Sequence, residues 1–248
     1  MQNKYDDNSF FEYYKNMRES NINANSLIEI PAMKSLLPDL KNKTVLDLGC
    51  GMGEMCKYYV EQGASSVYGI DLSQNMIDYA LEHNKLPNIT YNVMALEHIE
   101  KITEKFDVII SSLTFHYIED YNKLLKDIKN LLNDNGILVF SMEHPLTTAM
   151  QLPTDGSVTK YMELNNERYY IYKDYNNPGK RIVNWNNEDV VKHHRNFEIT
   201  INGLIENGFA INKILEPKAS EEAIKLVPKY KFQKDKPYFL LIKATAIK

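Results

Sequence analysis

The chain has 248 residues, of which 44% are hydrophobic and 25% are charged, and its formal net charge is -4. This composition is typical of a globular protein that buries most of its apolar surface without disulfide or metal cross-links. The net negative charge disfavours a dedicated nucleic-acid-binding protein, because such a protein needs a basic surface to neutralise phosphates. A local basic patch at residues 192–195 remains an alternative.

Three features favour the cytoplasm. The two cysteines, Cys50 and Cys56, are too few for a disulfide framework and are expected to be reduced thiols. The polar first 11 residues lack the basic start and apolar run of a secretory signal. No stretch approaches the roughly 20 apolar residues needed to cross a bilayer. We therefore expect a cytoplasmic protein with no membrane contact.

Helices are predicted at the start of the chain. Aromatic residues and Met17 recur at helical spacing between residues 10 and 17. Asn25 or Ser26 is expected to cap a second helix, which ends at Pro38. We interpret residues 1–40 as an N-terminal helical cover.

Residues 41–142 alternate predicted strands and helices, as in a parallel sheet with crossover helices. The strands are expected at 44–48, 67–70, 89–94, 106–110 and 137–142. Helices are expected at 54–62, after a cap at Ser73, and at about 121–132, with a turn at 133–136. Because the strands are largely apolar, we expect both faces of the sheet to be covered.

The alternation stops near Glu143. The segment from Glu143 to Arg195 is rich in tyrosine, asparagine and charged residues and is too long for a plain loop. It contains Pro153, Gly156, Pro178 and Gly179. We interpret residues 143–196 as an inserted substrate lid, with an extension of the core or a dimer contact as the alternative. A helix at 197–207 and strands at 209–215 and 237–244 are expected to complete the core, which we assign to residues 197–248.

A glycine-rich turn follows the first core strand. Gly49, Gly51 and Gly53 separate this strand from the helix that begins at Glu54. Glycine lets the backbone approach a ligand without a Cβ in the way, and such sheets bind ligands at the carboxyl ends of their strands. The dinucleotide fingerprint requires glycine where Glu54 stands. Asp71 ends the next strand, where its carboxylate could accept hydrogen bonds from ribose hydroxyls.

These segments resemble the class I S-adenosylmethionine (SAM)-dependent methyltransferases, in particular a type 11/25-like subgroup that acts on small molecules. The matching segments are 45–53 (motif I), 69–73 (motif II), 95–97 (adenine contact), 106–113 (fourth strand) and 133–138, where the family's proline is absent. The resemblance covers about residues 40–145. It implies an α/β fold with a Rossmann-like, seven-stranded, mostly parallel sheet, helices on both faces and an antiparallel last strand. It also implies SAM as methyl donor and S-adenosylhomocysteine (SAH) as product.

The expected SAM site combines the glycine turn, the acidic strand ends and the segments that cover SAM in similar methyltransferases. Its residues are Tyr14, Arg18, Asp47, Gly49, Cys50, Gly51, Asp71, Leu72, Met76, Ala95, Leu96, Glu97, Ser111, Ser112 and Leu113. Some of these residues have an alternative structural role. Asp71 could cap a helix, Met76 could pack in the hydrophobic core, and Glu97 could be a solvent-exposed loop residue. Cys50 is expected to act only through its backbone.

The candidate catalytic residues follow the fourth and fifth strands. His116 follows the fourth, and Glu143 and His144 follow the fifth. A methyl transfer needs mainly proximity and alignment, but an oxygen or nitrogen acceptor also needs a base. His116 could instead cover the cofactor, and Glu143 and His144 could form an ordered loop. Residues 193–195 are interpreted as structural, and no metal is expected, because the histidine spacing of a metal site is missing.

The expected function is methyl transfer from SAM to a small-molecule acceptor. A SAM-binding sensor or partner protein without catalysis is the alternative, and an NAD(P)-dependent oxidoreductase is disfavoured by Glu54. A nucleic-acid methyltransferase is disfavoured by the acidic charge and by residues 111–114, which do not match the Asn/Asp-Pro-Pro-Tyr/Phe motif of that class. No nucleic-acid partner is expected, and the sequence leaves the oligomeric state open.

Overall fold

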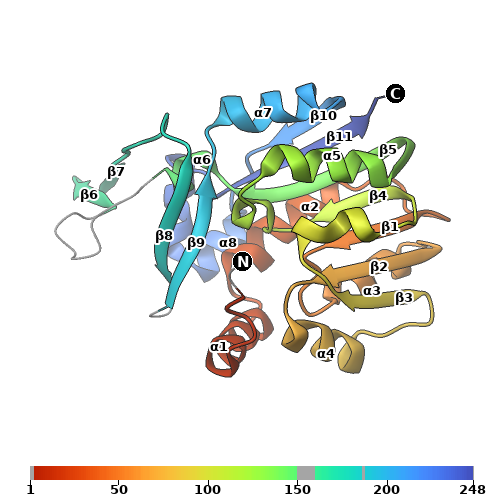
Figure 1. Cartoon of the computed structure of the whole chain (residues 1–248). Helices are drawn as coiled ribbons and strands as arrows, with labels where there is room; N and C mark the ends of the chain where they lie inside the picture. The colour runs from red at the N-terminus through yellow and green to blue at the C-terminus, as the bar shows by residue number, and fades with distance from the viewer. Residues whose placement is uncertain (1–2, 150–159, 186–187, 248) are drawn as a thin grey trace.

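A seven-stranded sheet forms the centre of the protein (Figure 1). The computed structural model describes residues 3–149, 160–185 and 188–247, and its strand order is β10-β11-β5-β4-β1-β2-β3. The strands are β1 (Thr44–Leu48), β2 (Ser66–Asp71), β3 (Ile89–Val93), β4 (Phe106–Ser111), β5 (Leu132–Glu143), β10 (Phe209–Leu215) and β11 (Phe239–Ala246). Strands β1 to β5 pair in parallel, whereas β11 is antiparallel to β5 and β10. The predicted Rossmann-like sheet with an antiparallel last strand is confirmed.

Helices cover both faces of this sheet, as predicted (Figure 1). One face packs against α5 (Tyr121–Leu131), α7 (Phe197–Glu206) and a 3-10 helix (Leu96–Lys101). The other packs against α2 (Ile30–Leu36), α3 (Glu54–Glu61), α4 (Gln74–His83), α8 (Glu221–Leu226) and a 3-10 helix (Pro228–Lys234). Neighbouring strand residues serve opposite faces, so Ile109 joins the first core and Ile110 the second.

The second helix begins differently from the prediction. A π-helical turn (Asn25–Glu29) leads into α2, and neither Asn25 nor Ser26 caps it. Instead, the Asn23 side chain accepts a hydrogen bond from the Ser26 N–H (2.9 Å), so the cap lies two residues earlier than the first candidate. The helix does end before Pro38, as predicted, because Leu37 is already extended with ψ 141°.

The predicted lid folds as a short helix and two β-hairpins, which were not predicted. These elements are α6 (Pro145–Thr148), β6 (Tyr161–Leu164), β7 (Glu167–Tyr170), β8 (Gly179–Trp185) and β9 (Glu188–His194). Both hairpins stand apart from the seven-stranded sheet (Figure 1). In β9 the buried positions alternate regularly, but two of the three are the polar Lys192 and His194, so the strand carries no apolar alternation. Pro153 and Gly156 lie outside the described residues.

The first helix, α1 (Asn8–Glu19), packs against the β8–β9 hairpin rather than against the sheet. The rings of Phe10 and Tyr14 meet Trp185 edge to face, with ring centres 5.4 and 6.3 Å apart. Lys4 Nζ forms an ion pair with Glu188 (2.7 Å). We call this set the α1–hairpin contact. It joins the predicted N-terminal cover to the predicted lid.

The predicted turn at 133–136 is an irregularity inside β5. Leu132 pairs with Phe106, and the pairing resumes with Ile137 opposite Val108, so four residues of β5 loop out. Asn135 takes a left-handed conformation there (φ 59°), which asparagine tolerates better than most residues. Among the described residues, no helix combines the length and apolarity required to cross a membrane.

Candidate active site

The glycine turn lies at the carboxyl end of β1, between the sheet and α3. The N–H groups of Gly49 and Cys50 donate to the Ile70 carbonyl (2.8 and 2.9 Å), which fixes the turn to β2. Gly51 has φ +52°, and a Cβ placed on it would meet no atom within 4 Å. At Gly49 a Cβ would lie 2.3 Å from Thr114 Oγ1. The turn therefore presents bare backbone to open space at Gly51 and is tightly packed at Gly49.

Asp71 holds the other side of this turn. Its Oδ2 accepts a hydrogen bond from the Gly51 N–H (3.0 Å), and its Oδ1 accepts one from the Ser73 N–H (2.9 Å). Burial raises the pKa of this carboxyl group, whereas the backbone hydrogen bonds act in the opposite direction. The carboxylate is thus oriented at the cavity edge, with lone pairs left for a ligand.

A cavity of about 1200 Å³, which we call the main cavity, runs from the glycine turn to the β8–β9 hairpin. Pockets for a single ligand hold roughly 300–1,000 Å³, so this cavity has room for more than one small molecule. Every residue of the predicted SAM site but one lines it, namely Tyr14, Arg18, Asp47, Gly49, Cys50, Gly51, Asp71, Leu72, Met76, Ala95, Leu96, Glu97, Ser112 and Leu113.

Ser111 is the exception, and its assignment to the cavity is corrected. Its side chain is fully buried, and its hydroxyl donates to the Leu48 carbonyl (2.8 Å). Successive side chains of a strand point to opposite faces, so Ser112 reaches the cavity while Ser111 ties β4 to β1.

Comparisons with known proteins agree with this arrangement. The family described as Methyltransferase domain matches residues 46–140. A solved S-adenosylmethionine-dependent methyltransferase from Mesorhizobium loti is 33% identical, covering 90% of this chain and 98% of its own, with a TM-score of 0.79. The chain belongs to the SAM-dependent methyltransferases. This methyltransferase therefore uses SAM as its methyl donor and releases SAH.

Two further relatives resemble this methyltransferase. An uncharacterized protein of Haemophilus influenzae is 37% identical, over 98% of this chain and 96% of its own length. A ubiquinone biosynthesis O-methyltransferase of Coxiella burnetii is 34% identical over 104 residues, which are 41% of this chain and 44% of that protein. The second similarity is thus confined to less than half of each chain.

Asp47 lies beneath the glycine turn and is almost fully buried. Its Oδ2 accepts a hydrogen bond from Cys56 Sγ (3.3 Å). Burial raises the pKa of Asp47 to about 7, and the charges of Asp71 and Glu29 add to the effect, whereas the Cys56 hydrogen bond lowers it. The folded protein therefore binds a proton at Asp47 that the unfolded chain has already lost near pH 5.

Replacing Asp47 with asparagine is expected to reduce the pH dependence of stability. A carboxyl group with a raised folded-state pKa stabilises the fold below the unfolded pKa of about 3.9, and this contribution disappears as the pH rises through 7. The wild type should therefore lose about 2–3 kcal/mol relative to Asp47→Asn between pH 5 and pH 8. Urea unfolding at both values measures the difference, with Asp78→Asn on the exposed side of α4 as the control. Equal slopes for wild type and Asp47→Asn would contradict the assignment.

His116 lines the main cavity but is poorly suited to be a base. The ring is buried, and its Nδ1 accepts a hydrogen bond from the Glu143 N–H (3.3 Å). Burial lowers the pKa of His116 to about 3, so the ring is neutral and its proton lies on Nε2. His116 can therefore donate a hydrogen bond into the cavity, and its accepting nitrogen is already occupied.

Glu143 and Lys192 form a buried ion pair at the same end of the cavity, with 2.5 Å between Oε1 and Nζ. Burial alone would raise the pKa of Glu143, but the charge and the hydrogen bond of Lys192 act against it, and this pKa lies below its usual range. Glu143 is thus a carboxylate at the carboxyl end of β5. Lys192 comes from β9, and sequence analysis had placed it only in the possible basic patch at residues 192–195.

His144 does not reach the cavity, and its catalytic assignment is corrected. Its Nδ1 accepts a hydrogen bond from the Leu146 N–H (3.1 Å), so it caps α6. Its Nε2 lies 2.8 Å from Oε1 of Glu216, the residue that follows the edge strand β10. Glu143 and His144 are successive residues at the end of a strand and point in different directions.

Residues 193–195 have mainly structural contacts. The Arg195 guanidinium is buried and donates to the carbonyls of Phe115, Ile118 and Glu119, in the turn that carries His116. His194 contacts the Thr148 hydroxyl (2.7 Å). Only His193 of the three lines the main cavity.

Sequence analysis also missed a buried carboxylate behind the cavity. Glu29 accepts hydrogen bonds from the hydroxyls of Ser141 (2.5 Å) and Ser112 (2.9 Å). Arg18 lies nearby and pairs with Glu54 (2.8 Å) at the start of α3. These contacts tie the N-terminal segment to the ends of β4 and β5. The sequence shows only a single glutamate within an otherwise apolar helical segment, and this pattern alone does not predict these contacts.

Proposed function

We propose that this methyltransferase methylates a small molecule that binds in the main cavity, at the end enclosed by the β8–β9 hairpin. The observation that carries the proposal is the continuity of one cavity from the glycine turn to Glu143 and Lys192. The volume exceeds that of a typical one-ligand pocket, and the hairpin encloses the far end, which leaves little room for a macromolecular surface. The similarity to the Coxiella O-methyltransferase supports a small acceptor.

In this proposal residues 41–142 and 197–248 form the SAM-binding core, residues 1–40 cover SAM, and residues 143–196 form the acceptor lid. Asp71 accepts hydrogen bonds from the ribose, and the bare backbone at Gly51 allows close approach of the cofactor. Ala95, Leu96 and Glu97 enclose the adenine end. When bound, SAM supplies an electrophilic methyl group, so the protein contributes mainly alignment and exclusion of water.

Glu143 takes the acceptor's proton in this proposal, and His116 and Lys192 position the reacting groups. A carboxylate on the rigid end of β5 can accept a hydrogen bond from a hydroxyl or amine of the acceptor. The Nε2–H of His116 can hold a second polar atom of the acceptor. Of the three candidate bases predicted from the sequence, we thus propose Glu143 alone.

A screen with small-molecule pools tests the function directly. The full chain is incubated with SAM and each pool, and mass spectrometry detects SAH together with a methylated product. We expect one pool to give both in equal amounts. Binding of SAM without SAH formation in any pool would contradict a small-molecule acceptor.

The Glu143→Gln variant tests the proposed base. We expect kcat to fall by roughly 10²-fold or more, because general-base catalysis contributes about 10²–10⁴-fold. SAH affinity, measured by calorimetry, should stay unchanged, since Glu143 lies away from the glycine turn. Glu216→Gln, which alters only the carboxylate beside His144, is the matched control. A kcat equal to that of the control would remove Glu143 as the base.

A further inference from the structure

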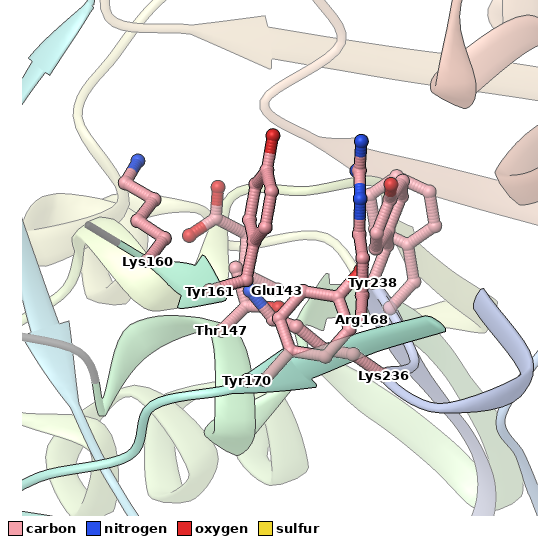
Figure 2. A pocket seen from close by; sticks show the side chains of 9 residues that line it. Glu143, Thr147, Lys160, Tyr161, Arg168, Tyr170, Lys236 and Tyr238 are labelled. Carbon is pink, nitrogen blue, oxygen red and sulfur yellow. The ribbon is translucent and has the colours of Figure 1, made fainter. Parts of the chain in front are cut away.

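Figure 2 shows residues that line a smaller cavity of about 330 Å³, which we call the side cavity. Glu143, Lys160 and Phe239 line both cavities, so the two meet at the carboxyl end of β5. Tyr161 and Tyr170 come from the β6–β7 hairpin and form aromatic walls of the side cavity. The site proposed for methyl transfer thus continues into a second compartment.

Lys236, which lines the side cavity, is a lysine with an unusually buried side chain. Its side chain is only 7% exposed. Within the described residues its ammonium takes part in no hydrogen bond or ion pair, and it lies 5.4 Å from the centre of the Tyr170 ring. Burial and the charge of Lys160 lower the pKa of Lys236 to about 8, while Glu143 opposes the shift. A largely buried lysine whose ammonium pairs with no carboxylate of the described residues is stabilised when a ligand supplies an anion.

The charges around the side cavity do not balance. Its described lining has three cations, Lys160, Arg168 and Lys236, and one carboxylate, Glu143. Glu143 is already paired with Lys192 (2.5 Å), and Arg168 is paired with Glu163 (2.7 Å). Positive charge therefore remains at Lys160, which lines both cavities, and at Lys236, which lines the side cavity.

We propose that the side cavity binds a carboxylate or phosphate group of the methyl acceptor, with Lys236 as its main contact. This inference rests on the proposed function, because the anion belongs to the molecule that is methylated in the main cavity. Lys160 adds a second positive charge, and the tyrosine walls suit a planar body next to the anionic group. The acceptor is thus an anion, and the cavity would select against neutral analogues.

Benzoate, phenyl phosphate and neutral benzamide are suitable probes. Each is titrated into the SAH-saturated full chain and followed by calorimetry. We expect one of the two anions to bind at least 10-fold more tightly than benzamide, and the better one identifies carboxylate or phosphate. Lys236→Met should lose this preference and keep SAH affinity. Lys234→Met, an exposed lysine two residues away, should behave as wild type.

A second measurement uses the wild type and does not depend on folding of a variant. Lys236 is labelled with acetic anhydride and quantified by mass spectrometry, and the anionic probe should slow its labelling several-fold while benzamide does not. Equal binding of anions and benzamide, or equal labelling with and without the anion, would overturn the proposal. A protein that binds SAH but not the anions refutes only this inference, whereas failure to bind SAH refutes the proposed SAM site.

Discussion

Asp71→Ala is expected to weaken SAM binding by about 2–4 kcal/mol, because the proposed SAM site then loses two charge-assisted hydrogen bonds to the ribose. This corresponds to roughly 30- to 1,000-fold in the dissociation constant. The structure adds a second cause, since Asp71 also accepts the Gly51 and Ser73 N–H groups and so holds the glycine turn. Calorimetric titration with SAH measures the change.

The control for this prediction is Asp78→Ala, an exposed acid on α4 that leaves the turn intact. Asp71→Asn should fall between the two, because it keeps an acceptor oxygen but loses the charge. The melting temperature of Asp71→Ala without ligand should fall modestly, because the Gly51 and Ser73 N–H groups lose their acceptor. If Asp71→Ala bound SAH as tightly as the control, Asp71 would not belong to the site.

Arg195→Met should destabilise the fold by about 3–5 kcal/mol. The guanidinium satisfies the carbonyls of Phe115, Ile118 and Glu119, and each buried acceptor left without a partner costs roughly 1–3 kcal/mol. These carbonyls belong to the turn that places His116 in the cavity, so methyl transfer should also fall. The free energy of unfolding in urea is the measurement.

Two variants make the Arg195 result specific. Arg195→Lys keeps the charge but offers fewer donors in a fixed plane, so an intermediate loss is expected. Lys180→Met, at an exposed position in β8, should stay near wild type. A loss below about 1 kcal/mol for Arg195→Met would indicate that water replaces the guanidinium.

The SAM-binding part of the site could be predicted from the sequence because the motifs that form it are close together in the chain. A strand, a glycine turn, a helix and an acid at the end of the next strand follow one another within 30 residues, and topology brings them together. The fold class followed from the same alternation. Asp71 and Gly51 accordingly lie at the cavity, as expected from their spacing.

The acceptor half was only partly accessible because it is assembled from distant segments. Lys192 pairs with Glu143 from β9, and Lys236 joins Glu143 in lining the side cavity from the loop before β11. No local sequence pattern predicts that these distant segments meet. Ser111 and His144 show a second reason. Sequence spacing located the strand ends, but the choice between neighbouring residues depends on which face each side chain takes.

The α1–hairpin contact has a consequence for the kinetic order of turnover. Phe10, Tyr14 and Trp185 join the element proposed to cover SAM to the element proposed to enclose the acceptor. If one closure serves both ligands, a ternary complex must form before the methyl group moves. SAH would then leave only after the methylated product has released the hairpin, so Trp185→Ala would disturb the dissociation of both products together.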